Sequence, residues 1–371
     1  MATGPSVLVV GGGIIGCATA LELARRGCRV TVLERGTPGG EASSAAAGLL
    51  APFGSTPEPD PFHRLAIASW RLYPQVVTEL RESTGIDVEH VTAGTLHPIA
   101  TPGDLEHAHA RREWPLAAEL GLEVVEGAEL VALEPALAKD VTAACLVRGD
   151  QWVNNQRLAT AYALAAAARG VTVRSGVEVG RILVAHGRAG GVLADGDRLT
   201  ADVVLLAAGA WSGALAAELG ERLPVGPVRG QMLAVSNVPA LVSHAIHHDD
   251  IYLVPRPSGE LLIGATVERV GFERAVTPDG LGGLIAQAVA LVPDIGRRPI
   301  TRSWCGFRPA APDALPVLGP WPDVAGLFVA TGHYRNGILL APITAAVMAD
   351  CIVDGKAPDS ITPFLPQRFV A

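Results

Sequence analysis

The sequence predicts an α/β fold in which a parallel-sheet domain is interrupted by an inserted α+β domain built on an antiparallel sheet. Two observations predict the first domain: an apolar strand at residues 7–10 runs into Gly11-Gly12-Gly13-Ile14-Ile15-Gly16, and a second apolar strand, residues 28–33, ends at Glu34. A third observation predicts the insertion. Residues 225–305 contain three apolar segments, at 231–235, 251–255 and 261–265, with the spacing of antiparallel strands.

The glycine-rich turn is typical of a Rossmann-like site for a nucleotide pyrophosphate. A diphosphate approaches the chain only where side chains are absent and where free N–H groups at a helix N-terminus face its charge. Gly11 turns the chain, Gly13 admits the phosphates and Gly16 lets the helix pack on the strand. Glu34 stands where an acid accepts from the ribose hydroxyls of adenosine. The pattern predicts a dinucleotide and leaves FAD and NAD open.

Later segments return to the same domain. We expect a helix at 155–169, a strand at 171–174, a meander at 177–200, two further strands at 202–206 and 327–331, and an apolar helix at 337–352. The strand at 202–206 ends in Ala207-Ala208-Gly209-Ala210, where small residues let a ligand approach the backbone. The predicted dinucleotide-binding domain is therefore discontinuous, comprising residues 1–85, 146–220 and 306–371, and residues 86–145 and 221–305 form the substrate-binding domain.

Composition excludes several classes of partner. The 371 residues are 49% hydrophobic and 18% charged, with a net charge of -8, so there is no broad basic surface for nucleic acid or an anionic membrane. We expect no membrane span, because no run reaches the roughly 18 uninterrupted apolar residues that one needs. The N-terminus lacks the positive region of a signal peptide, which predicts a cytoplasmic protein.

No metal site is expected. The five cysteines are scattered and without C-x-x-C spacing. His244, His247 and His248 stand beside Asp249 and Asp250, but adjacent residues seldom converge on one ion. We interpret residues 244–250 as a solvated lid over the active site.

The run Gly39-Gly40-Glu41-Ala42-Ser43-Ser44-Ala45-Ala46-Ala47-Gly48-Leu49-Leu50 favours FAD over NAD. These small and hydroxylated residues follow the ribose-binding acid closely. They would lie beside the pyrophosphate and ribityl chain of an extended FAD, with the isoalloxazine just beyond them.

With these pieces the chain resembles the D-amino-acid oxidase superfamily, and within it the glycine oxidases of thiazole (thiamine) biosynthesis, over nearly its whole length. The resemblance is carried by the two segments above together with later motifs. These are Tyr252-Leu253-Val254-Pro255-Arg256, Gly264-Ala265-Thr266, Gly306-Phe307-Arg308-Pro309 and Gly332-His333-Tyr334-Arg335-Asn336-Gly337-Ile338-Leu339-Leu340-Ala341-Pro342.

The resemblance implies non-covalent FAD and the oxidation of a small amino acid to its imine, with O2 reduced to H2O2. Glycine is the first expected substrate, followed by sarcosine and small D-amino acids. Arg308 would hold the substrate carboxylate, with Tyr252 as its hydroxyl neighbour and Arg335 as a second cation. A planar guanidinium suits this role because it makes two parallel charge-assisted hydrogen bonds. We also expect a homo-oligomer.

Several alternatives stay open. A secondary-amine oxidase, a quinone-linked D-amino-acid dehydrogenase and a non-catalytic flavin-binding subunit share the fold. Arg308 could instead pair with Asp313 at the surface. Cys305 stands near the place where related sarcosine oxidases attach flavin covalently. Val267 replaces a methionine of the glycine oxidases, which would leave more room near the substrate.

The residues expected at the FAD come from the motifs and from the resemblance together. The helix that starts near Asn336 would direct its positive end at the flavin. The full set is Gly11, Gly13, Ile14, Ile15, Gly16, Glu34, Arg35, Ser43, Ser44, Ala46, Ala47, Gly48, Leu50, Val177, Ala208, Gly209, Trp211, Gly306, Arg308, His333, Arg335, Asn336, Gly337 and Ile338.

Overall fold

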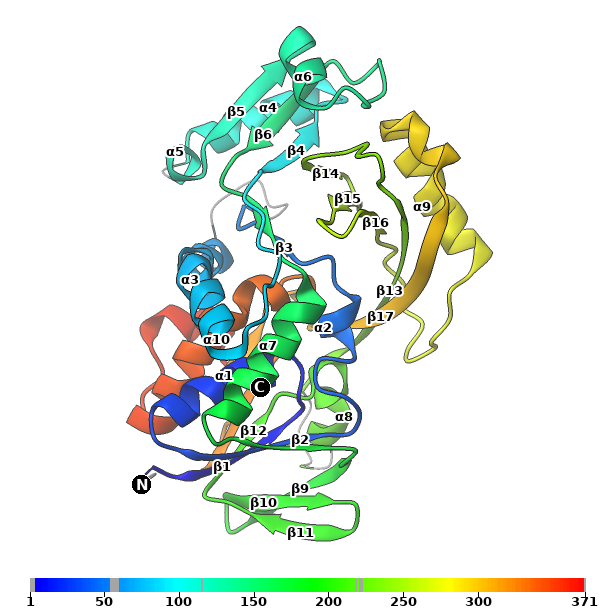
Figure 1. The fold of residues 1–371 in the computed structure, drawn as a ribbon. Coiled ribbons are helices and arrows are strands. Elements are labelled where there is room, and N and C mark those ends of the chain that lie inside the picture. Colours follow the sequence, from blue (N-terminus) through cyan, green and yellow to red (C-terminus); the bar gives the residue numbers. More distant parts are fainter. Residues whose placement is uncertain (1–3, 54–59, 115, 218, 220–222, 370–371) are drawn as a thin grey trace.

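The computed structural model describes residues 4–53, 60–114, 116–217, 219 and 223–369. In the described residues each of two lobes contains one large sheet, with β13 and β17 running from one lobe toward the other (Figure 1), and two smaller sheets of three and two strands accompany them. The predicted α/β architecture is thus confirmed. The domain boundary expected between residues 220 and 221 lies outside the described residues, and the division at the stated boundaries stays a prediction.

The first sheet has six strands in the order β18-β19-β12-β1-β2-β8. All neighbours are parallel except β18 and β19, which are antiparallel. The predicted strand, glycine turn, helix and second strand all form, and Glu34 is the last residue of β2. The strands are β1 (Ser6–Val10), β2 (Arg29–Glu34), β8 (Thr172–Ser175), β12 (Val203–Leu206), β18 (Val317–Pro320) and β19 (Leu327–Thr331).

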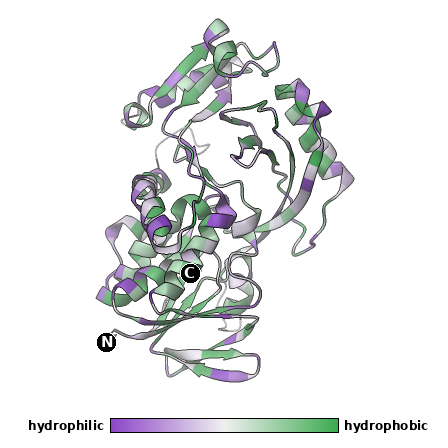
Figure 2. Cartoon of the chain, viewed as in Figure 1, coloured by the Kyte–Doolittle hydropathy of each residue, from purple (hydrophilic) through white to green (hydrophobic). Residues whose placement is uncertain are grey.

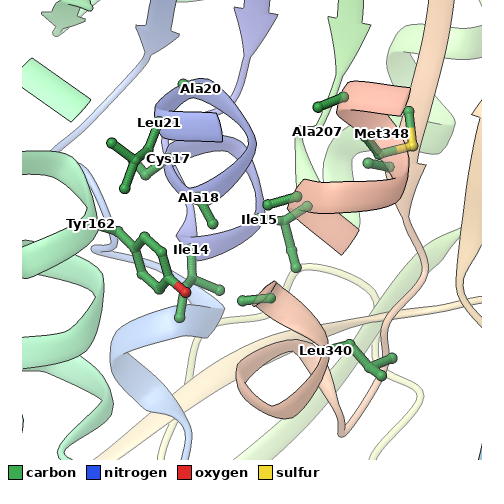
Figure 3. Close-up of a cluster of buried hydrophobic side chains, with 14 of the residues drawn as sticks. Ile14, Ile15, Cys17, Ala18, Ala20, Leu21, Tyr162, Ala207, Leu340 and Met348 are labelled. Carbon is green, nitrogen blue, oxygen red and sulfur yellow. The ribbon is translucent and has the colours of Figure 1, made fainter. Parts of the chain in front are cut away.

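Alternation along these strands buries both faces of the sheet. Val7 and Val9 of β1 face the helices, whereas Leu8 and Val10 pack toward the meander. On the helical side, Figure 3 shows residues of α1 beside side chains of α7 and α10. The helices are α1 (Ile14–Arg25), α3 (Pro61–Thr84), α7 (Asn155–Ala168) and α10 (Gly337–Ala349), and the meander is β9 (Val179–Ala185), β10 (Arg188–Ala194) and β11 (Asp197–Thr200).

The second sheet has eight strands in the order β17-β13-β16-β15-β14-β4-β6-β5. Neighbours are antiparallel except β14 and β4, and the three predicted segments become β13, β15 and β16. The strands are β4 (Thr95–Pro98), β5 (Leu122–Glu126), β6 (Ala143–Val147), β13 (Gly226–Ser236), β14 (Ala245–His248), β15 (Ile251–Pro255), β16 (Glu260–Gly264) and β17 (Ile300–Ala310).

The two faces of the second sheet have different tasks. Leu233, Leu253 and Ile246 lie on the face that packs against helix α9 (Pro278–Leu291) and form a core there. Because side chains alternate, the residues before or after them face the other way. Tyr252 and His247 therefore lie on the opposite face, where they line the large cavity.

Two features differ from the sequence analysis. Residues 244–250 comprise β14 and the turn that leads into β15, and β14 pairs with strands on both sides inside the sheet, so they do not form the separate lid that was expected. Helix α3, for which no element was predicted, is 24 residues long. Its signals were present: Asp60 accepts from the His63 amide, a proline follows the cap, and Gly85 ends the helix at φ 73°.

The remaining short elements connect or cap the two sheets. They are α2 (Ala42–Ala45), β3 (Leu49–Leu50), which pairs with β7 (Gln151–Trp152), α4 (Pro102–Arg112), α5 (Ala117–Leu120), α6 (Gly127–Leu133) and α8 (Ser212–Ala217), with short 3-10 or π turns at Gly209–Trp211, Pro293–Arg297, Asp350–Asp354, Asp359–Phe364 and Pro366–Phe369.

One helical stretch of the described chain, Gly337–Asp354, is long and apolar enough to cross a membrane by length and composition. Asp350 interrupts the apolar run within this stretch, so the criterion of roughly 18 uninterrupted apolar residues is not met, and the absence of a membrane span stays a prediction. In the fold 67% of the stretch is buried, and α10 packs between α1 and α3. Figure 2 shows apolar residues concentrated on the central strands and on the helices that cover them.

Candidate functional site

A single cavity of about 1000 Å³ is lined by residues of both sheets. Ligand pockets span roughly 300 to 1000 Å³, so this one is large enough for a dinucleotide together with a small substrate. The lining includes the N-termini of α1 and α10, the end of β2, the small-residue segment after α2, and the cavity-facing side of the eight-stranded sheet.

The N-terminus of α1 borders the cavity through backbone rather than side chains. Gly11 has φ 107°, which L residues rarely adopt, and its amide donates to Leu33 O at 2.9 Å. A Cβ built on Gly13 would meet only Ser43 Oγ, at 3.5 Å, so the space beside it is open. A Cβ on Gly16 would lie 2.0 Å from Gly11 O. Gly16 therefore permits packing inside the fold and does not line the cavity.

The Glu34 carboxylate is fixed by two amides at the end of β2. It accepts from Gly12 N at 2.8 Å and from Gly36 N at 2.7 Å. These bonds hold it at the cavity wall while leaving lone pairs for a further donor, because an ionised carboxylate accepts about four. Beside it, the Arg35 guanidinium stacks 3.7 Å from the centre of the Trp211 ring, and both line the cavity.

The small-residue segment is held from behind by a buried guanidinium. Arg256 is 7% exposed and donates to Ala47 O and to Asn155 Oδ1, each at 2.8 Å, and also to Val153 O. Burial lowers its pKa to about 10, so the group stays charged at neutral pH. Asn155 in turn donates to Ser43 O at 2.7 Å. The two side chains fix the segment that forms one wall of the cavity.

The N-terminus of α10 faces the cavity without a cap. Gly337 and Ile338 line the cavity, no side chain caps the helix, and its first turn holds no acid. The positive end of the helix dipole is therefore available to a ligand. Next to it, the His333 ring hydrogen bonds with Thr344 Oγ1 at 3.0 Å, and burial lowers its pKa to about 3. His333 is neutral at physiological pH.

Arg308 and Tyr252 meet at the other end of the cavity. Arg308 Nη1 donates to Thr266 O at 2.8 Å, and a Cβ on Gly230 would lie 2.5 Å from the guanidinium. Burial raises the pKa of the Tyr252 hydroxyl, and the neighbouring Arg308 opposes that rise. Asp313, the alternative partner, binds Arg368 at 2.8 Å instead. Within the described chain, Arg308 has no carboxylate partner.

Arg335 lies at the rim of the same region. Its Nη2 is 3.2 Å from Asp250 Oδ1, in a pair whose side chains are 39% and 75% exposed. Such a pair is screened by water and holds its partners loosely. Arg335 can therefore leave Asp250 for a stronger anion inside the cavity.

The structure brings nearly all of the expected site residues to one cavity. Gly16, Ser44 and Leu50 do not line it: Ser44 Oγ donates to Gly40 O at 2.9 Å and Leu50 is fully buried in the core. Val267 does not line it either and is 43% exposed, so its side chain does not shape the pocket as expected. Several lining or supporting residues have no role among the expected site residues, and His247 among them was expected only within the lid: Met232, Gly230, His247, His97, Asp150 and Arg256.

The cavity fits an extended FAD in its shape and donors. Gly13 leaves open space beside the start of α1, and the Glu34 carboxylate is held at the cavity wall with capacity for a further donor, as the pyrophosphate and ribose of FAD would require. The N-termini of α1 and α10 both border the cavity without a hydrogen bond from an N-cap side chain, and such helix ends favour negatively charged ligand groups. These features together define a dinucleotide-binding oxidoreductase.

The chain belongs to the DAO family of FAD dependent oxidoreductases, whose profile matches residues 6–351. It is 37% identical to glycine oxidase of Geobacillus kaustophilus, over 98% of this chain and 97% of that protein. The crystal structure of glycine oxidase from the same organism superimposes with a TM-score of 0.92 at 37% identity, covering 99% of each chain.

A second group of relatives joins this unit to another. The bifunctional protein ThiO/ThiG of Trichormus variabilis is 38% identical over 98% of this chain. The alignment covers 55% of that protein, so this chain spans about half its length. The predicted family is thus confirmed, and the cofactor is FAD.

Proposed function

We propose that the protein is a glycine oxidase that converts glycine to its imine at non-covalent FAD while O2 is reduced to H2O2. The observation that carries the proposal is Arg308, a guanidinium without a carboxylate partner in the described chain, in the same cavity as the FAD cradle. The likeness to glycine oxidases supports glycine as the substrate. The match to ThiO/ThiG proteins supports a place in thiamine thiazole biosynthesis.

The chain's own residues bind and orient the substrate. The Arg308 guanidinium receives the carboxylate in two parallel hydrogen bonds, and the Tyr252 hydroxyl donates a third. Arg335 adds positive charge from the rim. This arrangement fixes the α-carbon, and orientation supplies much of the rate because the reacting atoms must meet at close range.

The chemistry that FAD would supply here, when bound, is that of a hydride acceptor for the α-carbon. The uncapped end of α10 borders the cavity and would stabilise negative charge on a flavin ring bound there. No acid or base is required at the α-carbon once the amine is neutral. Cys305 does not line the cavity, which supports non-covalent binding.

Anaerobic mixing of the purified yellow protein with glycine tests the proposal. Glycine should bleach the flavin absorbance, and air should restore it with one H2O2 formed per glycine consumed. Failure of glycine, sarcosine and D-alanine alike to bleach the flavin contradicts the assignment. Bleaching without reoxidation by O2 supports a quinone-linked dehydrogenase instead.

We further propose that the protein works in the cytoplasm as a homo-oligomer. Light scattering tests the assembly, and colour released from acid-denatured protein tests the non-covalent attachment.

A further inference from the structure

A row of polar side chains leads away from the Arg308 end along the cavity face of the eight-stranded sheet. His247 of β14 is the register partner of Tyr252 of β15, and their ring centroids are 6.5 Å apart. His97 of β4 follows, with its ring 5.4 Å from that of His247. The row ends at Asp150, whose Oδ2 is 3.9 Å from His97 Nε2. Tyr252, His247, His97 and Asp150 all line the cavity.

Asp150 is the unusual member of the row. It is 0% exposed, and within the described residues neither carboxylate oxygen has a partner in good hydrogen-bond geometry, although the Thr95 hydroxyl is near enough to act on its pKa. A buried polar group without a partner destabilises the fold by roughly 1 to 3 kcal/mol, and more when it is charged. Burial raises its pKa to about 8, against the opposing effects of Thr95 and Arg111. A ligand that donates hydrogen bonds to Asp150 would relieve this cost.

The two histidines make this end of the cavity a region of acceptors. Burial, the largest cause for each, lowers the pKa of His97 to about 4 and that of His247 to about 3. A neutral imidazole keeps one nitrogen as an acceptor. Arg111 acts on both rings electrostatically but does not line the cavity. A group with several N–H donors suits this environment better than an anion.

We propose that Asp150, His97 and His247 form a second subsite, which binds a protonated amine at the far end of a glycine derivative whose carboxylate is held by Arg308. The inference rests on the proposed function and extends it to N-substituted glycines with a cationic tail. The oxidation itself is unchanged: the glycyl carbon loses a hydride to FAD, the neutral amine becomes the iminium, and O2 takes the electrons. The tail ammonium remains intact and donates to Asp150.

The length of the tail follows from the sheet. Neighbouring strands lie about 4.8 Å apart, so the two spacings from Tyr252 on β15 to His97 on β4 alone correspond to roughly 10 Å, and the tail must also cover the reach from Arg308 to Tyr252 and from His97 to Asp150. Glycine alone leaves this region unfilled. A tail of several methylene groups is needed for an ammonium to reach Asp150 from the clamp.

The first experiment uses the wild-type holoenzyme and measures O2 consumption. N-(ω-aminoalkyl)glycines of increasing length are compared with N-alkylglycines of equal length and with N-(ω-carboxyalkyl)glycines. We expect one aminoalkyl length to exceed its neutral counterpart in kcat/KM by about tenfold or more, because the neutral tail leaves Asp150 unpaired. The anionic series should be poorest. Equal or better turnover of the neutral or anionic tails at every length overturns the subsite.

Glycine in the same assay separates the two proposals. Absence of glycine oxidation refutes the proposed function, whereas glycine oxidation without any preference for cationic tails refutes the subsite alone.

The second experiment compares Asp150→Asn with Asp249→Asn. The readout is the kcat/KM for the substrate with the cationic tail divided by the kcat/KM for the substrate with the neutral tail. Both values are measured on the same preparation, so a lower fraction of folded enzyme does not change the ratio. Asp150→Asn should bring the ratio to about one. Asp249 lines the cavity, but its side chain is 79% exposed, so water screens its charge. Its φ of 50° is a conformation that asparagine adopts readily. Asp249→Asn should therefore keep the ratio. The subsite is overturned if Asp150→Asn keeps the ratio or if Asp249→Asn loses it equally. His97→Gln, which should lower the ratio severalfold, repeats the test if Asp150→Asn does not fold.

Discussion

Arg308 donates through Nη1 to the backbone carbonyl oxygen of Thr266 at 2.8 Å, and this bond leaves most of its N–H groups free. The partner is neutral, so the positive charge of the guanidinium is not cancelled. Arg308 is half-buried in the cavity lining, so a ligand of opposite charge can pair with its guanidinium there.

Arg308→Ala should therefore act on substrate binding. Losing one member of a desolvated charge pair costs about 2 to 5 kcal/mol, so kcat/KM for glycine should fall by roughly 30-fold to several thousand-fold, mostly through KM. Steady-state oxygen consumption measures the change. Arg297→Ala removes an exposed cation that pairs with Asp294 at 2.9 Å and does not line the cavity, and it serves as the control. A change in kcat/KM below threefold in Arg308→Ala would contradict the carboxylate clamp.

Gly13→Ala and Gly16→Ala should separate cofactor binding from folding. A Cβ on Gly13 meets nothing closer than 3.5 Å and enters the cavity, so this variant should fold normally but bind FAD about tenfold or more weakly. A Cβ on Gly16 would lie 2.0 Å from Gly11 O, so the second variant should lose about 1 to 3 kcal/mol of stability. Thermal unfolding and FAD titration of the apoprotein measure the two effects. Equal FAD affinity in Gly13→Ala and wild type would refute the pyrophosphate assignment.

Asn155→Ala should loosen the wall formed by the small-residue segment. The asparagine accepts from Arg256 at 2.8 Å and donates to Ser43 O and Ser44 O, all in a buried place. Its loss leaves a buried donor and acceptors unpaired, which should lower the free energy of unfolding by about 2 to 4 kcal/mol and weaken FAD binding.

Gln156→Ala is the matched control for that variant. Gln156 also donates to Ser44 O, at 3.2 Å, but from an exposed position. Its removal should change stability by less than about 0.5 kcal/mol. Comparable losses of Tm in the two variants would show that burial of the Asn155 bonds is not what holds the segment.

His333 should make the protein sensitive to acid. Its pKa is lowered from 6.5 to about 3 in the fold, so between these values the unfolded chain binds a proton that the folded chain does not. The free energy of unfolding therefore falls as the pH decreases, by about 2 kcal/mol for this group between pH 7 and pH 5.

His333→Gln should remove that share of the pH dependence. The fall in Tm from pH 7 to pH 5, measured with saturating FAD, should be smaller in this variant than in wild type. His109→Gln, on an exposed face of α4, should retain the wild-type dependence. Identical pH dependence in wild type and His333→Gln would rule out a buried neutral His333.

The sequence could predict the elements whose signals are local. The glycine turn, the strand that ends at Glu34 and the small-residue termini of β12 and β19 each follow from neighbouring residues and the approach of a ligand. Arg308 and Tyr252 were reached through motif resemblance, and the structure places both at one end of the cavity.

Other parts depend on long-range contacts that local patterns do not carry. Arg256 donates to the carbonyl oxygens of Val153 and Ala47 and to the side-chain oxygen of Asn155, which lie 101 to 209 positions earlier in the chain. The residues next to Arg256 in the sequence do not indicate these partners. Asp150 follows a strand like many turn aspartates, and only the fold shows its burial beside His97. Val267 was expected near the substrate but is 43% exposed. Its position depends on how the strand before it ends, which the local sequence does not show.

The order of strands in the six-stranded sheet bears on when the cofactor can be taken up. β19 pairs with β12, and the N-terminus of α10 lines the cavity. β19 and α10 both belong to the final fifth of the chain. A growing polypeptide on the ribosome can form β1, α1 and β2 early. The residues expected beside the flavin ring, in β19 and α10, emerge only at the end of synthesis. We therefore expect FAD to bind only after the C-terminal residues have been synthesised. Stalled chains that end before β19 should lack flavin absorbance.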